Sequence, residues 1–144
     1  MTQRIGFIFA GQGAQHVGMG KDLAAASGRA AHIFDTADSV LGKNLSHICF
    51  EGPESSLTET ENCQPAIYAM SLACLAALQE KVNLSPAFCA GLSLGELTAA
   101  AAAGVYDFET GISLVQERSR LMQQACRESE GGMAAVLNAP EEQF

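Results

Sequence analysis

The stretch Gly91-Leu92-Ser93-Leu94-Gly95-Glu96 follows an apolar run, Ala87–Ala90, and opens an alanine-rich run, Leu94–Ala103. The first run is typical of a buried strand and the second of a helix. A serine between two glycines at such a junction is typical of a nucleophile elbow, a turn so sharp that only glycine fits beside the serine. The sequence therefore predicts an exposed Ser93 hydroxyl suited to acyl chemistry. A plain strand-turn-helix corner is the alternative.

A second apolar run, Ile5–Ala10, also ends in a glycine turn, Gly11–Gln15. The run predicts a strand buried on both faces of a parallel sheet. Ligands bind at the carboxyl ends of such strands, so if the two strands are neighbours, Gln12 lies beside Ser93. The backbone N–H groups of Gln12 and Leu94 would then form an oxyanion hole. A turn without a ligand is the alternative, and no Lys-Ser/Thr pair marks a P-loop.

The order of the remaining elements predicts an α/β fold with a parallel sheet. Because a helix start signal after Asn138 is followed within a turn by the chain end, we expect the chain to be truncated. Further helices are predicted over Lys21–Ala26, over Ala30–Leu41 and over a short segment after Pro53, which has a capping box from Ser56 to Glu59. A central helix is predicted over Pro65–Leu78, with Pro65 in its first turn, and another from the cap Asp107 to about Cys126. Gly104 is expected to end the elbow helix, and a third strand is predicted over Met133–Leu137.

Composition narrows the classes of function. The 144 residues, 48% hydrophobic, fit one globular domain, and the net charge of −8 argues against a nucleic-acid partner. No apolar run is long enough to span a membrane, so we expect a cytoplasmic protein or a processed organellar one. Five cysteines without a C-x-x-C pair indicate neither a disulfide framework nor a metal site. Cys74 and Cys89 are expected in the core.

Several motifs occur along the chain in a fixed order: Gly11-Gln12-Gly13-Ala14-Gln15, Val17-Gly18-Met19-Gly20, Gln64-Pro65-Ala66, the Gly91–Glu96 elbow, Ala103-Gly104-Val105, and Arg118 followed by Met122. Together they resemble the malonyl-CoA:acyl carrier protein transacylases and the acyltransferase domains of fatty-acid and polyketide synthases. The resemblance runs from Ile5 to Leu137, with two departures: Ala10 and Leu92 stand where many members have proline and histidine.

The resemblance implies an α/β-hydrolase-like body, of which residues 1–127 are the first part, with residues 128–144 starting a ferredoxin-like small subdomain. It implies transfer of a malonyl group from malonyl-CoA to the phosphopantetheine thiol of acyl carrier protein. Ser93 would be the nucleophile, and the N–H groups of Gln12 and Leu94 would hold the oxyanion. Gln64 would line the pocket. No cofactor is implied beyond the coenzyme A of the substrate.

By the same resemblance, Arg118 would bind the free malonyl carboxylate. A guanidinium holds a carboxylate through two parallel N–H bonds, which selects a dicarboxylic acyl group over acetyl. Without the resemblance, Arg118 is interpreted as an exposed helix residue beside Glu117.

Serine also needs a base, and the family's catalytic histidine lies downstream of this sequence. The three histidines present, His16, His32 and His47, do not match it. The chain is thus interpreted as a piece of a longer enzyme, as one half of a split protein whose second chain supplies the histidine, or as a non-catalytic relative. The rival functions are a serine hydrolase or thioesterase with the same elbow, and an inactive fragment that only binds acyl-CoA or carrier protein.

Overall fold

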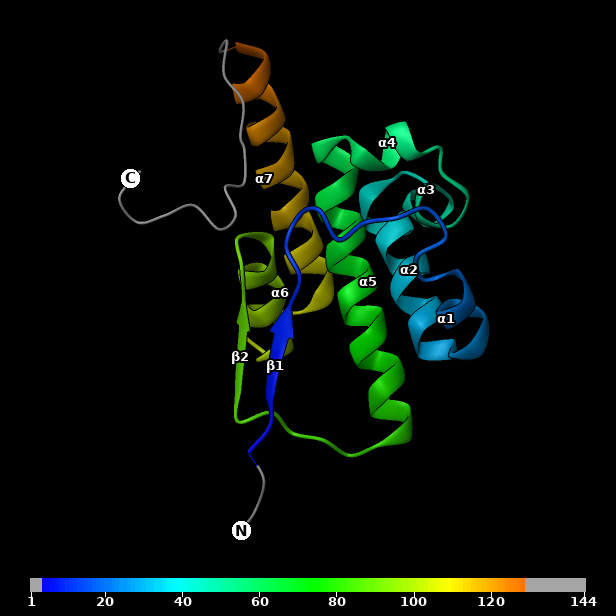
Figure 1. Cartoon of the computed structure of the whole chain (residues 1–144), viewed down its shortest axis with the longest axis vertical. Coiled ribbons are helices and arrows are strands. Elements are labelled where there is room, and N and C mark those ends of the chain that lie inside the picture. The colour runs from blue at the N-terminus through cyan, green and yellow to red at the C-terminus, as the bar shows by residue number, and fades with distance from the viewer. Residues whose placement is uncertain (1–3, 129–144) are drawn as a thin grey trace, which may run out of the picture.

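The computed structural model describes residues 4–128 and has an α/β architecture with a small parallel sheet. Helix α5 lies in the middle, between α7 and α2 (Figure 1). The elements follow in the order β1 (Gly6–Phe9), α1 (Lys21–Ala26), α2 (Gly28–Leu41), α3 (Leu45–Glu51), α4 (Glu54–Thr58), α5 (Thr60–Lys81), β2 (Phe88–Gly91), α6 (Leu94–Ala102) and α7 (Phe108–Glu128).

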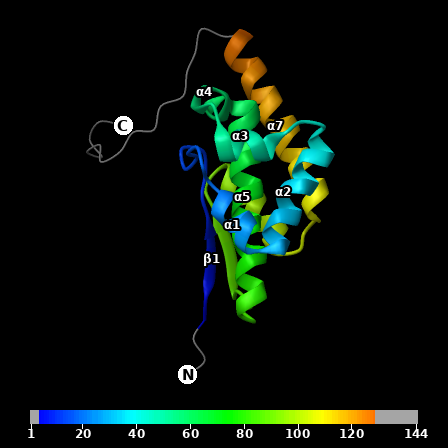
Figure 2. The ribbon, with the colours of Figure 1, turned by 90° about the vertical axis from the view of Figure 1, so that its right-hand side faces the viewer.

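Strands β1 and β2 pair in a parallel sheet, and they are direct neighbours, the condition under which Gln12 was expected beside Ser93. Gly6 is paired with Phe88 and Phe9 with Gly91, so the two strands end at the same level. The prediction that β1 is buried on both faces is wrong for the described part of the chain. Ile8 is 80% exposed, because α5, α2 and α7 lie on one side of the strands (Figure 2).

Helix α5 is the centre of the hydrophobic core, as its apolar sequence predicted. Its residues 63–69 are buried, and it contacts α2, α6 and α7. The predicted start at Pro65 is wrong, because the helix begins at Thr60 and contains Pro65 in its interior. Proline has no N–H for the carbonyl of Glu61, four residues earlier. The Lys43 Nζ donates a hydrogen bond to that carbonyl instead, at 3.0 Å.

Helix α4 also begins differently from the prediction. The expected capping box from Ser56 to Glu59 is absent, because Pro53 precedes the first helical residue and its carbonyl accepts from the Ser56 N–H at 3.0 Å. The predicted cap of α7 is confirmed, since the Asp107 carboxylate accepts from the Thr110 N–H at 2.8 Å. Gly104, with φ of 79°, follows α6 as predicted.

Two of the five cysteines, Cys49 and Cys63, are fully buried. Burial raises the pKa of the Cys49 thiol to about 12, so this thiol stays protonated. Cys74, expected in the core, is exposed, and Cys89 is partly buried. Within residues 4–128, no group of three or more acidic, histidine or cysteine residues is arranged to hold a metal ion.

None of the described helices combines the length and the apolar character needed to cross a membrane. The predicted strand Met133–Leu137 lies outside the described residues. Of the predicted subdomain, residues 128–144, the structure describes only Glu128, which is the last residue of α7.

Candidate active site

The turn between β2 and α6 has the geometry of a nucleophile elbow. Ser93 has φ of 55° and ψ of −104°, and it is the only non-glycine residue of the described chain with a positive φ. A side chain in such a conformation costs about 1–3 kcal/mol, which the surrounding structure must offset. The strand, the strained serine and the helix thus occur in the order that the motif requires, and the Ser93 side chain is exposed.

The glycines on either side of Ser93 allow the backbone segments to cross at short range. A Cβ atom on Gly91 would lie 2.1 Å from the carbonyl carbon and oxygen of Gly95. A Cβ on Gly95 would lie 2.3 Å from the carbonyl oxygen of Phe9, at the end of β1. These distances are far below van der Waals contact, so both positions require glycine.

The glycine loop after β1 passes directly against the elbow. A Cβ atom on Gly11 would lie 2.8 Å from the carbonyl oxygen of Leu92. The two glycine turns therefore meet, as expected for neighbouring parallel strands. In the part of the chain that the structure describes, the backbone N–H groups of Gln12 and Leu94 donate no hydrogen bond to another residue. Both are free to bind an anion beside Ser93.

Arg118 reaches the elbow from α7. Its Nη2 donates a hydrogen bond to Ser93 Oγ at 2.8 Å, and its Nη1 donates to Gln64 Oε1. Arg118 is half-buried, so the interpretation as an exposed residue beside Glu117 is wrong. Within residues 4–128 no carboxylate forms an ion pair with this guanidinium. Its positive charge is therefore available to an anion at the elbow.

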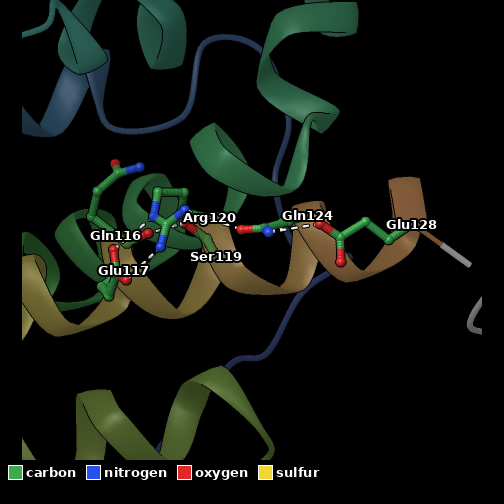
Figure 3. A network of polar contacts seen from close by, with 6 residues as sticks. All are labelled: Gln116, Glu117, Ser119, Arg120, Gln124 and Glu128. Atoms are coloured by element: carbon green, nitrogen blue, oxygen red, sulfur yellow. Dashed lines mark hydrogen bonds and ion pairs between the residues drawn. The ribbon is translucent and has the colours of Figure 1, made fainter.

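Glu117 pairs instead with the other arginine in this part of α7. The Arg120 Nη2 lies 2.7 Å from Glu117 Oε1, and Arg120 also donates to Gln124, which donates to Glu128 (Figure 3). The hydrogen bond from Arg120 holds the pKa of the Glu117 carboxyl below its usual value. These exposed contacts lie along the outer side of the helix, and Arg118 takes part in none of them.

Gln64 connects the parts of the site, whereas the resemblance implied only that it lines the pocket. Its side chain is fully buried on α5. Besides accepting from Arg118, it donates from Nε2 to Gln12 Oε1 at 3.4 Å and to Met122 Sδ at 3.3 Å. The site therefore joins the loop after β1, α5, the elbow and α7. Met122 belongs to the motif of Arg118 followed by Met122, and the resemblance implied no role for it.

A close helix crossing holds α7 against α5 near the site. A Cβ atom on Gly111 would lie 1.9 Å from the Tyr68 hydroxyl, and Tyr68 stacks on Phe108 with ring centroids 5.5 Å apart. Gly111 and Arg118 are seven residues apart, and so lie on one face of α7. Tyr68 and Gln64 share a face of α5 in the same way. Gly111, a glycine in the first turns of α7, was the sequence signal for this crossing.

The histidines lie elsewhere. His16, His32 and His47 are all exposed, and within residues 4–128 no histidine side chain is hydrogen-bonded to Ser93.

The turn between β2 and α6, with Ser93 at its apex, places this chain among the α/β proteins that have a nucleophile elbow. The chain belongs to the acyl transferase domain family, whose sequence model matches residues 6–144. It is 42% identical over 134 residues to the malonyl CoA-acyl carrier protein transacylase of Bacillus subtilis, across 93% of this chain and 42% of that protein.

Solved structures show the same likeness. An acyl carrier protein S-malonyltransferase from Vibrio cholerae superposes with a TM-score of 0.81 at 41% identity, covering 85% of this chain and 40% of that one. A complex of a type II PKS acyl-carrier protein with its malonyl-transacylase also gives 0.81, at 42% identity and with the same coverage. This chain thus spans about two fifths of the length of the relatives it matches.

Proposed function

We propose that this protein transfers a malonyl group from malonyl-CoA to the phosphopantetheine thiol of an acyl carrier protein, through an acyl-serine intermediate on Ser93. The observation that carries this proposal is the 2.8 Å contact between Arg118 Nη2 and Ser93 Oγ. In a malonyl thioester one methylene separates the reacting carbonyl from the free carboxylate. A nucleophile and a carboxylate-binding group must therefore lie side by side, and the names of the relatives agree with this substrate.

The reaction takes place in two halves. Ser93 Oγ gives its proton to a base and attacks the thioester carbonyl, and the free N–H groups of Gln12 and Leu94 bind the resulting oxyanion. The carbon–sulfur bond then breaks, and the departing coenzyme A sulfur takes up the proton. In the second half the phosphopantetheine thiol loses its proton to the base and attacks the malonyl ester. The bond to Ser93 Oγ breaks and that oxygen regains a proton.

Arg118 selects the acyl group in this proposal. Its two present partners, Ser93 and Gln64, are neutral, so an incoming carboxylate meets an uncompensated charge. Two parallel N–H bonds to that carboxylate hold the malonyl group while Ser93 reacts. An acetyl group offers no such partner.

The base in this proposal is a histidine outside residues 4–128, on a further part of the protein or on a second chain. The exposed positions of His16, His32 and His47 support this assignment. We further propose that residues 1–127 form the first part of an α/β-hydrolase-like body and that residues 128–144 start a ferredoxin-like subdomain. The protein would act in the cytoplasm, in fatty-acid or polyketide synthesis, without a bound cofactor.

The test is the intact mass of the protein before and after brief exposure to malonyl-CoA, with Ser93→Ala as the control. In the presence of the part that supplies the histidine, we expect a malonyl adduct on the unaltered protein and none on the variant. An adduct on both would exclude Ser93 as the acceptor, and an adduct on neither would contradict the acyl-serine step. Steady release of free malonate without any carrier protein would instead favour a hydrolase.

A further inference from the structure

We propose that Gln64 is a positioning residue that holds the Arg118 guanidinium at the elbow and thereby sets the preference for acyl groups with a free carboxylate. This inference rests on the proposed function, in which Arg118 binds that carboxylate. It assigns to Gln64 an action on Arg118, where the sequence indicated only a pocket wall.

The hydrogen bonds of Gln64 fix the orientation of its amide. Arg118 has donors only, so it must face the amide oxygen, and it donates to Gln64 Oε1. On the opposite side lies the thioether of Met122, which can only accept, so it requires the amide nitrogen, at 3.3 Å; the same nitrogen donates to Gln12 Oε1 at 3.4 Å. Chemistry on both sides thus selects one orientation, and in that orientation an oxygen is aimed at the guanidinium.

Burial stabilises this orientation of the Gln64 amide. Gln64 is fully buried, so water cannot replace a lost partner, and each unpaired polar atom would carry a desolvation cost. The side chain also lies one helical turn from Tyr68, whose contact with Gly111 brings α7 against α5. Gln64 is therefore held by hydrogen bonds on both sides of its amide, one helical turn from the crossing of α5 and α7.

The neutrality of Gln64 is as important as its shape. A carboxylate at this buried position would form an ion pair with Arg118 and compete with the substrate carboxylate for the same donors. The amide accepts one hydrogen bond from Nη1 without cancelling the charge. It leaves the guanidinium ordered and still attractive to an anion.

The Arg118-x₃-Met122 spacing follows from the same contacts. Residues four apart lie on one face of a helix, so Arg118 and Met122 approach Gln64 together. Arg118 donates to the amide oxygen, and Met122 accepts from the amide nitrogen. The thioether thus supports the orientation that the guanidinium needs.

Two substitutions of Gln64 separate positioning from a merely structural role. We expect Gln64→Leu to raise KM for malonyl-CoA and lower kcat/KM for malonyl transfer by about 10- to 100-fold, the effect of losing a buried hydrogen bond to a charged group. Acetyl transfer should change by less than about threefold, because the acetyl group has no carboxylate for Arg118 to bind. Equal losses for malonyl and acetyl groups would overturn the proposal.

Gln64→Glu gives the sharper result. It keeps the size and the acceptor oxygen, so a structural role predicts a milder loss than that of Gln64→Leu. Positioning by a neutral partner predicts a malonyl loss at least as large, which grows as rising pH ionises the new carboxyl. Gln79→Leu, the same substitution at an exposed position of α5, is the matched control and should leave both rates within about twofold.

Binding of free malonate and acetate, measured by calorimetry on the unaltered protein, tests the proposal without any transfer chemistry. The protein should bind malonate more tightly than acetate, and Gln64→Leu should lose most of that difference. Equal malonate affinity in the two proteins would overturn the positioning role, as would a failure of the unaltered protein to discriminate. If malonate is discriminated but no malonyl adduct forms, the proposed function fails and the role of Gln64 remains supported.

Discussion

Two of the three arginines of helix α7, Arg118 and Arg120, have different kinds of partner. Arg120 lies on the outer side of the helix and forms an ion pair with Glu117 (Figure 3). Arg118 faces the elbow, where its partners are the neutral side chains of Gln64 and Ser93. Paired with a carboxylate, a guanidinium is electrically satisfied. Held by neutral acceptors, it keeps an unbalanced charge, which is the condition for binding an anionic substrate.

The largest effect that this comparison predicts is that of Arg118→Ala. Malonyl transfer should fall by about 10²- to 10³-fold in kcat/KM, because two charge-assisted hydrogen bonds to the substrate carboxylate are lost. Transfer of acetyl groups should be retained or improved. The measurement is the ratio of malonyl to acetyl transfer in competition, and an unchanged ratio would remove Arg118 from substrate selection.

Gly111→Ala tests whether the helix crossing places Arg118. The added Cβ would lie 1.9 Å from the hydroxyl of the buried Tyr68, so α7 must move away from α5. We expect the free energy of unfolding to fall by about 1–3 kcal/mol, the usual cost of overpacking, together with a partial loss of malonyl preference. Both are measured on one preparation, by urea unfolding and by the competition assay.

Two further variants control this experiment. Tyr68→Phe in the Gly111→Ala background removes the clashing oxygen and should restore part of both losses. Gly28→Ala, at the start of α2 with nothing within 4 Å of the new atom, should not lower stability. Full malonyl preference in a destabilised Gly111→Ala protein would show that the crossing does not place the guanidinium.

Arg118→Lys separates charge from geometry. Lysine keeps the positive charge but replaces the planar fork with a single flexible ammonium group. We expect a loss of about tenfold in malonyl kcat/KM, well short of the loss for Arg118→Ala, with malonyl still preferred over acetyl. A loss as large as that of Arg118→Ala would mean that the fork, rather than the charge, carries the selection.

The smallest effect belongs to Arg120. Arg120→Ala should leave malonyl transfer within about twofold, because the exposed pair with Glu117 is remote from the elbow. Its signature is a pH dependence of stability. Since the pKa of Glu117 is lowered in the folded chain, the pair stabilises the protein above the ordinary carboxyl pKa, and this contribution disappears as the pH falls through the folded value.

Urea unfolding at pH 7 and at pH 3.5 measures this contribution. The unaltered protein should lose slightly more stability on acidification than Arg120→Ala does. A larger acid loss in the variant would contradict the assignment of the lowered pKa to this pair.

Local sequence signals predicted the elbow, the two strands that precede the glycine turns and the cap of α7 by Asp107. Each depends on residue types close together in the chain, such as glycines beside Ser93 or a short polar residue before a helix. The start of α5 was wrong for the opposite reason. Pro65 is tolerated inside that helix because Lys43, from another part of the chain, donates to the carbonyl that proline leaves free.

The role of Gln64 at the site also depends on residues far away in the sequence. Its three side-chain partners, Gln12, Arg118 and Met122, lie 52, 54 and 58 residues away in sequence. No periodicity or spacing records a contact over such distances. The exposure of Ile8 and Cys74 was missed similarly, because apolar character predicts a preference for burial and does not identify the element that covers a given face.

The close crossings at Gly91 and Gly95 involve backbone atoms alone. The position of the Ser93 hydroxyl thus depends on two residues that have no side chain, whereas the proposed preference for an acyl group depends on side chains of α5 and α7. The preference for an acyl donor can therefore be changed by substituting side chains of α5 and α7, without altering the turn. A substitution at either glycine would instead displace the reactive oxygen for every donor alike.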